Sequence, residues 1–346
     1  MREAVIVISD LYLKPGELAA GGGQGLPALS YAGRFGEREH LGGGWREWLA
    51  RWLGHPGLAR APVAEVAAAA LPRRPAGATR WIATPVELVA GLTRVHLDRR
   101  GLVHLSSPEL AELTTRFEGT FGGASGLALE PLADGQLLLT TPGIAAVASS
   151  EPARCAGAVL DVPQGPAAAA LLRLRAEIEM WLHAEPLNAA RRARGAPAVS
   201  GLWLWGATGD VTAVEALAPE AVADGGARPA TAAFGTDAYL AGLCRLTGTP
   251  RASLPADLGA ALASAAAPRL ILVATMGGEA PAAEASGLAA TAAALEGQLI
   301  GPALAALGRG TLARLTLLAS DTRVTLTRHS GLKRWRRPRA GLAAFA

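Results

Sequence analysis

The sequence predicts an α/β fold with a mostly parallel central sheet, flanking helices and a C-terminal antiparallel hairpin. Short apolar runs alternate along the chain with stretches whose apolar residues recur at helical spacing. Two of these runs, Val199–Trp205 and Arg269–Thr275, are apolar on both faces, as strands inside a sheet are. The last two predicted strands follow each other after a short turn, which indicates a hairpin.

Length and composition favour a globular protein. The chain has 346 residues, of which 50% are hydrophobic and 18% charged, so it can bury a large core and wholesale disorder is excluded. We expect residues 1–346 to form one large α/β domain. The two cysteines, Cys155 and Cys244, exclude a disulfide-dense scaffold or a four-cysteine metal site.

The chain contains no apolar window long enough for a membrane span. Its first apolar run, Ala4–Ile8, is also too short for the core of a signal peptide. We therefore expect a cytoplasmic protein without a membrane-spanning segment.

The N-terminal third begins with a buried strand. Ala4–Ile8 is β-branched and ends at Ser9 and Asp10, a position where α/β proteins often carry a ligand or catalytic acid. Residues 14–44 are rich in glycine and predict a loop. Residues 60–80, rich in alanine, proline and arginine, predict a short helix and a linker.

Residues 45–53 predict an amphipathic helix with an aromatic stripe. Its apolar side chains fall at helical spacing and form one face: Trp45, Trp48, Leu49 and Trp52. A stripe of this kind packs into a core more often than it stacks on a ligand, and we favour the packing interpretation.

The middle of the chain predicts strands and two helices. Trp81–Pro85 indicates a strand, and Ser107 followed by Pro108 marks a helix start. Leu127–Leu129 and Gln136–Thr140 predict a hairpin. The longest predicted helix opens at Pro166 and is kinked or ended by Pro186. After the strand at residues 199–205, we expect a strand at 269–275, a helix at 288–307, and strands at 312–319 and 324–327.

Two local motifs could bind a ligand. Gly206, Gly209 and Asp210 follow a predicted strand, and a glycine turn there could present N–H groups to an anion. Glu179 and His183 share a helix face and could supply two metal ligands. For both motifs we favour the plainer alternative, a connecting turn and a solvated polar face.

Positive charge is concentrated at the C-terminal end. Residues 322–346 contain seven basic residues and no acid. The basic tail, residues 331–346, carries an aromatic, Trp335, among its charges: Lys333, Arg334, Arg336, Arg337 and Arg339. Such a tail could bind nucleic acid, anionic lipid or an acidic partner. We favour its packing on the protein's own surface over nucleic-acid binding.

Residues 161–206 resemble a known family. The segments DVPQGP, EIEMWLH, EPLNAAR and SGLWLWG, with WRRPR in the tail, are similar to the RpfE-type regulatory proteins of proteobacteria, which are often labelled phosphoglycerate mutase-like. The resemblance implies a bacterial regulatory protein on a degenerate alkaline-phosphatase or phosphoglycerate-mutase-like scaffold. That superfamily uses two divalent metals held by Asp and His, and a Ser nucleophile.

The metal ligands that this resemblance implies match the sequence only in part. Asp10 fits the aspartate at the end of the first strand, Asp321 fits a later strand end, and His329 could stand for a terminal histidine. Thr322 replaces the expected histidine after Asp321. Asp321 is also a natural turn residue. A two-metal site needs about six or seven ligands, so we favour structural roles for these three residues.

Three hypotheses remain open from the sequence. The first is a regulatory protein that binds a small phosphorylated ligand or a protein partner without catalysis. The second is a phosphotransferase of the mutase class that uses Mn, Zn or Mg held by Asp10, Asp321 and His329. The third is a factor that associates with nucleic acid through the basic tail.

Overall fold

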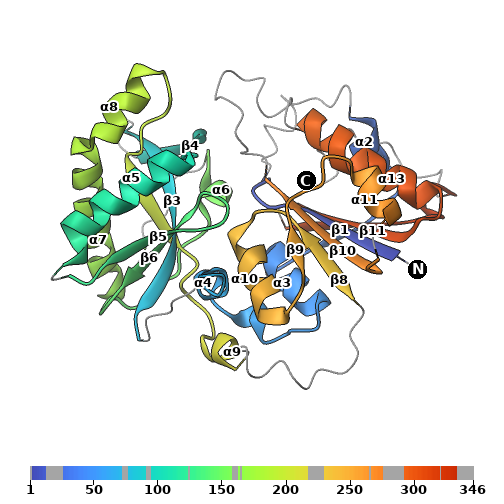
Figure 1. Ribbon diagram of the computed structural model, residues 1–346, viewed down its shortest axis with the longest axis horizontal. Helices are drawn as coiled ribbons and strands as arrows, with labels where there is room; N and C mark the ends of the chain where they lie inside the picture. Colours follow the sequence, from blue (N-terminus) through green and yellow to red (C-terminus); the bar gives the residue numbers. More distant parts are fainter. Residues whose placement is uncertain are drawn as a thin grey trace. The chain divides into compact units, whose positions relative to one another are not determined.

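A computed structural model gives the structure of the protein (Figure 1). It describes residues 2–12, 26–71, 77–90, 95–123, 125–157, 163, 166–216, 230–264, 266–275, 292–319 and 321–332. The chain divides into two compact units, where the sequence analysis expects one domain. Unit 1 comprises Met1–Ala59, Pro219–Leu240 and Thr247–Ala346, and unit 2 comprises Arg60–Ala218 and Ala241–Leu246.

Unit 1 contains the predicted parallel sheet with its C-terminal hairpin. The strand order is β2-β12-β11-β1-β10-β8-β9. Strands β11, β1, β10, β8 and β9 run parallel, whereas β12 and β2 are antiparallel to their neighbours. The strands are β1 (Arg2–Ile8), β2 (Glu37–His40), β8 (Thr231–Phe234), β9 (Arg251–Ala252), β10 (Arg269–Ala274), β11 (Leu312–Ala319) and β12 (Thr322–Thr327).

Strand β1 lies inside this sheet, between β10 and β11. Its residues Ala4–Ile8 are all buried, as expected for a parallel strand that is covered on both faces. Alternate residues, including Ala4, Ile6 and Ile8, belong to the main core of unit 1. The predicted first strand is thereby confirmed.

Helices cover both faces of the unit 1 sheet (Figure 1). On one face lie α2 (Pro27–Phe35), α11 (Leu258–Ser264) and α13 (Gly301–Gly308), which follows a π-helical turn at Glu296–Ile300. On the other lie α3 (Gly44–Trp52) and the start of α10 (Ala238–Thr247). Short 3-10 turns complete the described segments at Leu58–Arg60 and Ser330–Leu332.

Unit 2 has an antiparallel sheet. Its order is β4-β3-β6-β5, and β7 also pairs with β3. The strands are β3 (Thr79–Ala90), β4 (Val95–Leu102), β5 (Ala128–Pro131), β6 (Leu137–Thr141) and β7 (Gly201–Trp205). The helices are α4 (Val63–Ala68), α5 (Ser107–Phe117) with a π-helical turn at Glu118–Gly122, α6 (Pro152–Cys155), α7 (Pro166–Ala184), α8 (Pro186–Ala193) and α9 (Thr212–Glu215).

Strand β7 does not belong to the predicted parallel sheet. Every residue of Gly201–Trp205 is buried, so the predicted strand and its burial are confirmed. Its partner β3 is antiparallel to it, however, and the strand belongs to the sheet of unit 2. Burial of a strand on both faces therefore shows only that other elements cover both faces of its sheet. It does not show whether the neighbouring strand is parallel or antiparallel.

A predicted loop contains regular structure. Residues 14–44 include α2 and β2, although residues 13–25 lie outside the described part of the chain. Residues 60–80 contain the predicted short helix, as α4, and the start of β3. Helix α5 is capped by Ser106, one residue before the predicted Ser107, because Ser106 and Glu109 form a reciprocal capping box.

Helix α2 forms in a glycine-rich region because a distant carboxylate caps it. Glu296 accepts hydrogen bonds from the backbone N–H groups of Ala28 (2.6 Å) and Leu29 (3.0 Å). The Glu296 side chain is buried. These two bonds satisfy N–H groups that a helix start leaves without intrahelical partners.

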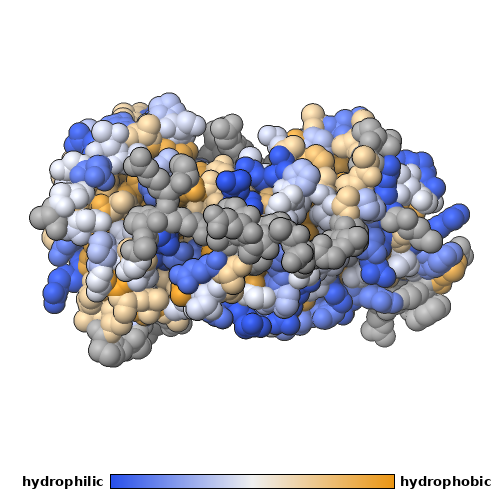
Figure 2. Space-filling model, turned by 60° about the horizontal axis from the view of Figure 1, so that its bottom comes forward, coloured by the Kyte–Doolittle hydropathy of each residue, from blue (hydrophilic) through white to orange (hydrophobic). Residues whose placement is uncertain are grey.

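Among the described residues no helix has the length and apolarity to span a bilayer. On the face shown in Figure 2, hydrophilic residues are interspersed with smaller apolar groups.

We expect Glu296→Ala to lower the free energy of unfolding of unit 1 by about 2–3 kcal/mol, because the buried N–H group of Leu29 and the half-buried N–H group of Ala28 lose their acceptor. Glu296→Gln should cost less, since its amide oxygen can still accept one bond. Urea unfolding measures both variants, with Glu177→Ala, a change at an exposed glutamate, as the control. A loss within about 0.5 kcal/mol for Glu296→Ala would contradict this account of α2.

Candidate functional site

The register of unit 1 brings Asp10 and Asp321 to one edge of the sheet. Ile8 of β1 is paired with Ala319 of β11 in a parallel ladder. Asp10 and Asp321 each follow two residues later, so both lie beyond the carboxyl ends of adjacent strands. In open α/β sheets, ligands bind at this edge.

Neighbouring strand ends hold this edge in place. The Ser9 N–H donates to the carbonyl oxygen of Ala274 at 2.9 Å, which ties the end of β1 to the end of β10. The Leu41 N–H donates to the carbonyl oxygen of Asp321 at 2.6 Å. Asp10 and Asp321 are both half-buried. We name this part of unit 1, comprising Ser9, Asp10 and Asp321, the carboxyl edge.

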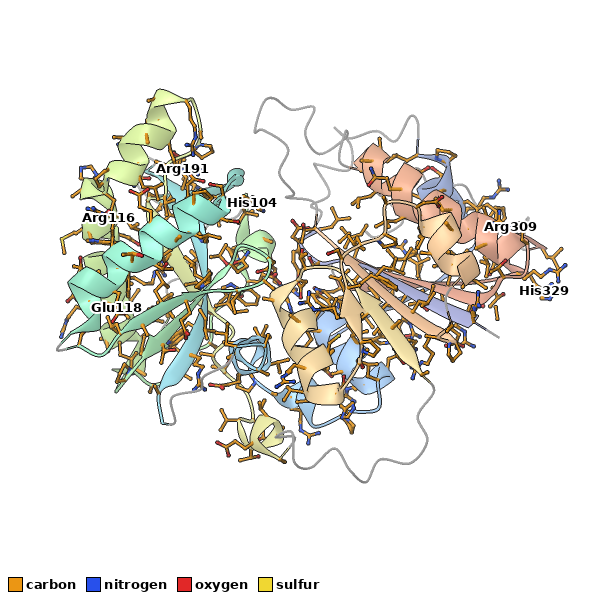
Figure 3. The ribbon with its side chains drawn as sticks, in the orientation of Figure 1. His104, Arg116, Glu118, Arg191, Arg309 and His329 are labelled. Atoms are coloured by element: carbon orange, nitrogen blue, oxygen red, sulfur yellow. The ribbon has the colours of Figure 1, made fainter. Side chains whose placement is uncertain are left out.

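His329 lies at the opposite edge of the same sheet. Strand β12 runs antiparallel to β11, so its last residue, Thr327, pairs with Arg314 near the start of β11. Strand β11 has eight residues, which at about 3.3 Å per residue separates the two edges by about 20 Å. Figure 3 shows His329 projecting from the same end of unit 1 as Arg309. The structure thus brings Asp10 and Asp321 together and does not bring His329 to them.

The described residues do not fit the two-metal centre that the family resemblance implies. Such a centre needs His and Asp ligands converging on one point. Within the described ranges, no three His, Cys, Asp or Glu side chains form a group that could hold a metal ion. Two aspartates at the carboxyl edge are a partial match.

Glu179 and His183 occupy different environments on α7. Glu179 is half-buried, and its carboxylate lies 3.9 Å from the guanidinium of Arg175. Burial raises the pKa of Glu179, and the charge of Arg175 opposes this shift. His183 is exposed. The helix therefore places one residue against the protein and the other in solvent, and the described residues provide no third ligand near them.

The turn at Gly206, Gly209 and Asp210 packs against the segment that leads into α4. Gly206 accepts a hydrogen bond from the Ala64 N–H at 2.9 Å, and the Asp210 N–H donates to Arg60 at 2.8 Å. Gly209 has a φ of +150°, and a Cβ there would lie 2.6 Å from the Pro62 nitrogen. Close backbone packing thus explains the glycine.

Asp210 closes the turn locally. Its carboxylate accepts from the hydroxyl of Thr212 at 2.5 Å and from the Thr212 N–H at 3.1 Å. The hydroxyl bond is the main cause of the lowered pKa of Asp210. These contacts give a structural explanation for the connecting turn that the sequence analysis favours. Anion binding at this turn stays a prediction. The basic tail residues Lys333, Arg334, Arg336, Arg337 and Arg339 lie outside the described residues.

Two residues of the segment EPLNAAR, Asn188 and Arg191, form a buried polar network in unit 2. Asn188 donates to the carbonyl oxygens of Leu182 and Val199, each at 2.8 Å, and accepts from the Val199 N–H at 2.7 Å. These bonds fasten the junction of α7 and α8 to the segment before β7. The segment EPLNAAR thus has a structural explanation.

Arg191 extends this network to α5. Its Nε donates to the carbonyl oxygen of Pro197, and its Nη1 donates to Glu109, both at 2.6 Å. Arg194 also pairs with Glu109. On the same side of unit 2, Glu185 pairs with Arg116, which Figure 3 labels together with Arg191. The spacing of Ser106 and Glu109, which fits a capping box, is the sequence signal that could have pointed to Glu109.

The environment of Glu109 favours its charged form. Burial alone would raise the pKa of this carboxyl, but hydrogen bonds outweigh it. The donors are the Ser106 N–H, the Arg191 guanidinium, the Ser106 hydroxyl and the Arg194 guanidinium, and they lower the pKa from 4.5 to about 2. Glu109 is therefore ionised at neutral pH and anchors α5 to α8.

Sequence reasoning missed a pocket in unit 1. It has a volume of about 460 Å³ and is lined by residues of α3, β2, β11 and β12, including Trp48, Trp52, Arg314 and Arg323. The aromatic stripe of α3 was its only sequence signal. The stripe divides in the structure, because Trp45 is fully buried whereas Trp48 and Trp52 line the pocket.

Comparison with known proteins gives structural neighbours only. No protein-family model and no curated protein matches the chain. A cofactor-independent phosphoglycerate mutase from Thermoplasma acidophilum DSM 1728 is similar over 94% of this chain and 90% of that chain, with 15% identity and a TM-score of 0.39. The PH0037 protein from Pyrococcus horikoshii is similar over 94% and 87%, with 12% identity and a TM-score of 0.48. The description of the fold therefore rests on the strand order and register given above.

We expect Glu109→Gln to lower the free energy of unfolding by about 3 kcal/mol at pH 7, because Arg191 loses its buried counter-charge. The folded-state pKa of Glu109 lies below its ordinary value, so its contribution is complete above pH 4.5 and is lost as the pH falls towards 2. Unfolding curves across this range, with the exposed Glu118→Gln as control, measure the effect. A destabilisation that does not shrink on acidification would contradict it.

Proposed function

We propose that the protein is a regulatory binding protein of the RpfE type, which binds a small phosphorylated molecule or a protein partner without transferring a phosphoryl group. One observation carries this proposal. The register of β1, β11 and β12 separates His329 from Asp10 and Asp321 by about the length of a strand. A single metal centre cannot use ligands that far apart, since metal–ligand bonds are about 2 Å long.

The family part of the proposal rests on the sequence resemblance at residues 161–206. The buried network around Asn188 and Arg191 supports it indirectly, because it gives the segment EPLNAAR a reason to keep its residue types together. Each polar atom in such a network needs its partner, so substitutions there are costly. We propose that relatives with this segment share the arrangement of α7, α8 and β7.

A second candidate is favoured by one specific observation. Asp10 and Asp321 lie at the ends of adjacent parallel strands, and paired carboxylates are suitable ligands for a divalent cation such as Mg²⁺. A phosphotransferase of the mutase class would need further ligands there. In this alternative, Asp10 and Asp321 bind the cation and His329 has no role.

The two candidates differ in metal content and turnover. We expect protein incubated with Mn, Zn and Mg, then desalted, to retain well below two equivalents of transition metal by elemental analysis. We also expect no conversion of 3-phosphoglycerate with any of the three metals. His329→Ala should change neither the retained metal nor the conversion of 3-phosphoglycerate, because His329 lies at the far edge of the sheet.

Two equivalents of retained metal together with phosphoglycerate turnover would overturn the proposal. The second candidate then predicts that Asp10→Asn and Asp321→Asn each abolish metal retention and phosphoglycerate turnover, while each variant still folds. Glu177→Gln, at an exposed position of α7, serves as the matched control for the loss of a carboxylate. Circular dichroism confirms that each variant is folded.

A further inference from the structure

The pocket of unit 1 lies on a face of the sheet, and its floor is polar. Arg314 pairs with Thr327 across β11 and β12, and Thr316 pairs with Thr325. Directly paired residues project to the same face of a sheet, so these side chains form one polar row. The alternate residues Leu315, Leu317 and Val324 face the core. The floor therefore combines hydroxyl groups with the guanidinium of Arg314, and Glu3 of β1, which is paired with Arg314, projects from the same face.

Two indoles of α3 form a wall of this pocket. The rings of Trp48 and Trp52 stack with a centroid separation of 6.0 Å and an interplanar angle of 21°. Arg269 lies over Trp52 at 3.5 Å from the ring centroid, and its Nη2 donates to the Trp52 carbonyl oxygen at 2.6 Å. Both tryptophans are partly exposed. Arg323 also lies over the Trp48 ring, 5.6 Å from its centroid. Arginines thus already contact both indoles, and the rest of each ring is partly exposed.

The guanidinium groups at the pocket retain binding capacity. Arg314 has a side chain that is 54% exposed, and its nearest carboxylate, Glu3, is 3.6 Å away, a loose pair. Arg323 pairs with Glu39, but its buried Nε has no hydrogen-bond partner. Glu37 and Glu39 also line the pocket. Arg314 is therefore the group most available to an incoming anion.

We propose that this pocket binds an aromatic phosphate monoester of about mononucleotide size. The three terminal oxygens of a phosphate can accept hydrogen bonds from Arg314 and from the hydroxyls of Thr316 and Thr327. The aromatic part packs against Trp48 and Trp52, as bases do on aromatic side chains. The volume of about 460 Å³ suits a small ligand. The inference rests on the proposed binding function and names its ligand class and location.

Calorimetric titration with AMP tests this pocket, with adenosine and inorganic phosphate as fragments. We expect AMP to bind, and each fragment to bind at least about tenfold more weakly. Arg314→Gln should weaken AMP at least about tenfold and leave adenosine unchanged. Trp48→Ala should weaken AMP and adenosine together, and Trp48→Phe should restore most of the affinity.

Arg309→Gln is the matched control, because Arg309 is an exposed arginine of unit 1 outside the pocket lining (Figure 3). Circular dichroism and thermal unfolding establish that the variants are folded. An absence of AMP binding, or an AMP affinity unchanged by both Arg314→Gln and Trp48→Ala, would overturn the inference.

The failure of this inference can be told apart from failure of the proposed function. If AMP binds but only Asp10→Asn or Asp321→Asn weakens it, the ligand occupies the carboxyl edge, and the pocket inference is wrong while the binding function stands. If the protein turns over 3-phosphoglycerate, the proposed function is wrong whatever AMP does.

Discussion

The position of β1 between β10 and β11 is the constraint on which unit 1 depends. Five consecutive residues of this strand, Ala4–Ile8, are buried, and both neighbours run parallel to it. Because parallel ladders align strand ends, this position fixes which loops share an edge. It brings residues from the start and the end of the chain together at the carboxyl edge. It also lets β12 return to the opposite edge as part of a hairpin.

The same register separates two regions with different chemistry. The carboxyl edge presents the carboxylates of Asp10 and Asp321, which favour cations. The pocket on the sheet face combines Arg314, threonine hydroxyls and the indoles of α3 with two carboxylates, Glu37 and Glu39. The carboxyl edge offers a phosphorylated ligand carboxylates, which repel it, whereas the pocket offers it donors from Arg314 and the threonines beside its own carboxylates. This difference gives the proposed binding function a location that does not depend on metal ligands.

Local sequence patterns predicted where helices and strands form better than they predicted which of these elements contact one another. The alternation of apolar runs was enough to predict β1, β11 and β12, and Pro166 and Pro186 marked the bounds of α7 and α8. Helix α2 could not be predicted, because its cap comes from Glu296, far along the chain. The candidate site was predicted in part. Asp10 and Asp321 follow strand ends that the sequence marks, whereas the distance of His329 and the pocket at Trp48 depend on strand register and on helix placement.

The separation of His329 from the aspartates can be measured directly. Nitroxide labels at Asp10→Cys with Asp321→Cys, and at Asp10→Cys with His329→Cys, would be compared by electron paramagnetic resonance in a background with Cys155 and Cys244 replaced. The register of β1, β11 and β12 predicts strong dipolar broadening for the first pair and a distance of about 20 Å or more for the second. Broadening of similar strength in both pairs would contradict the account.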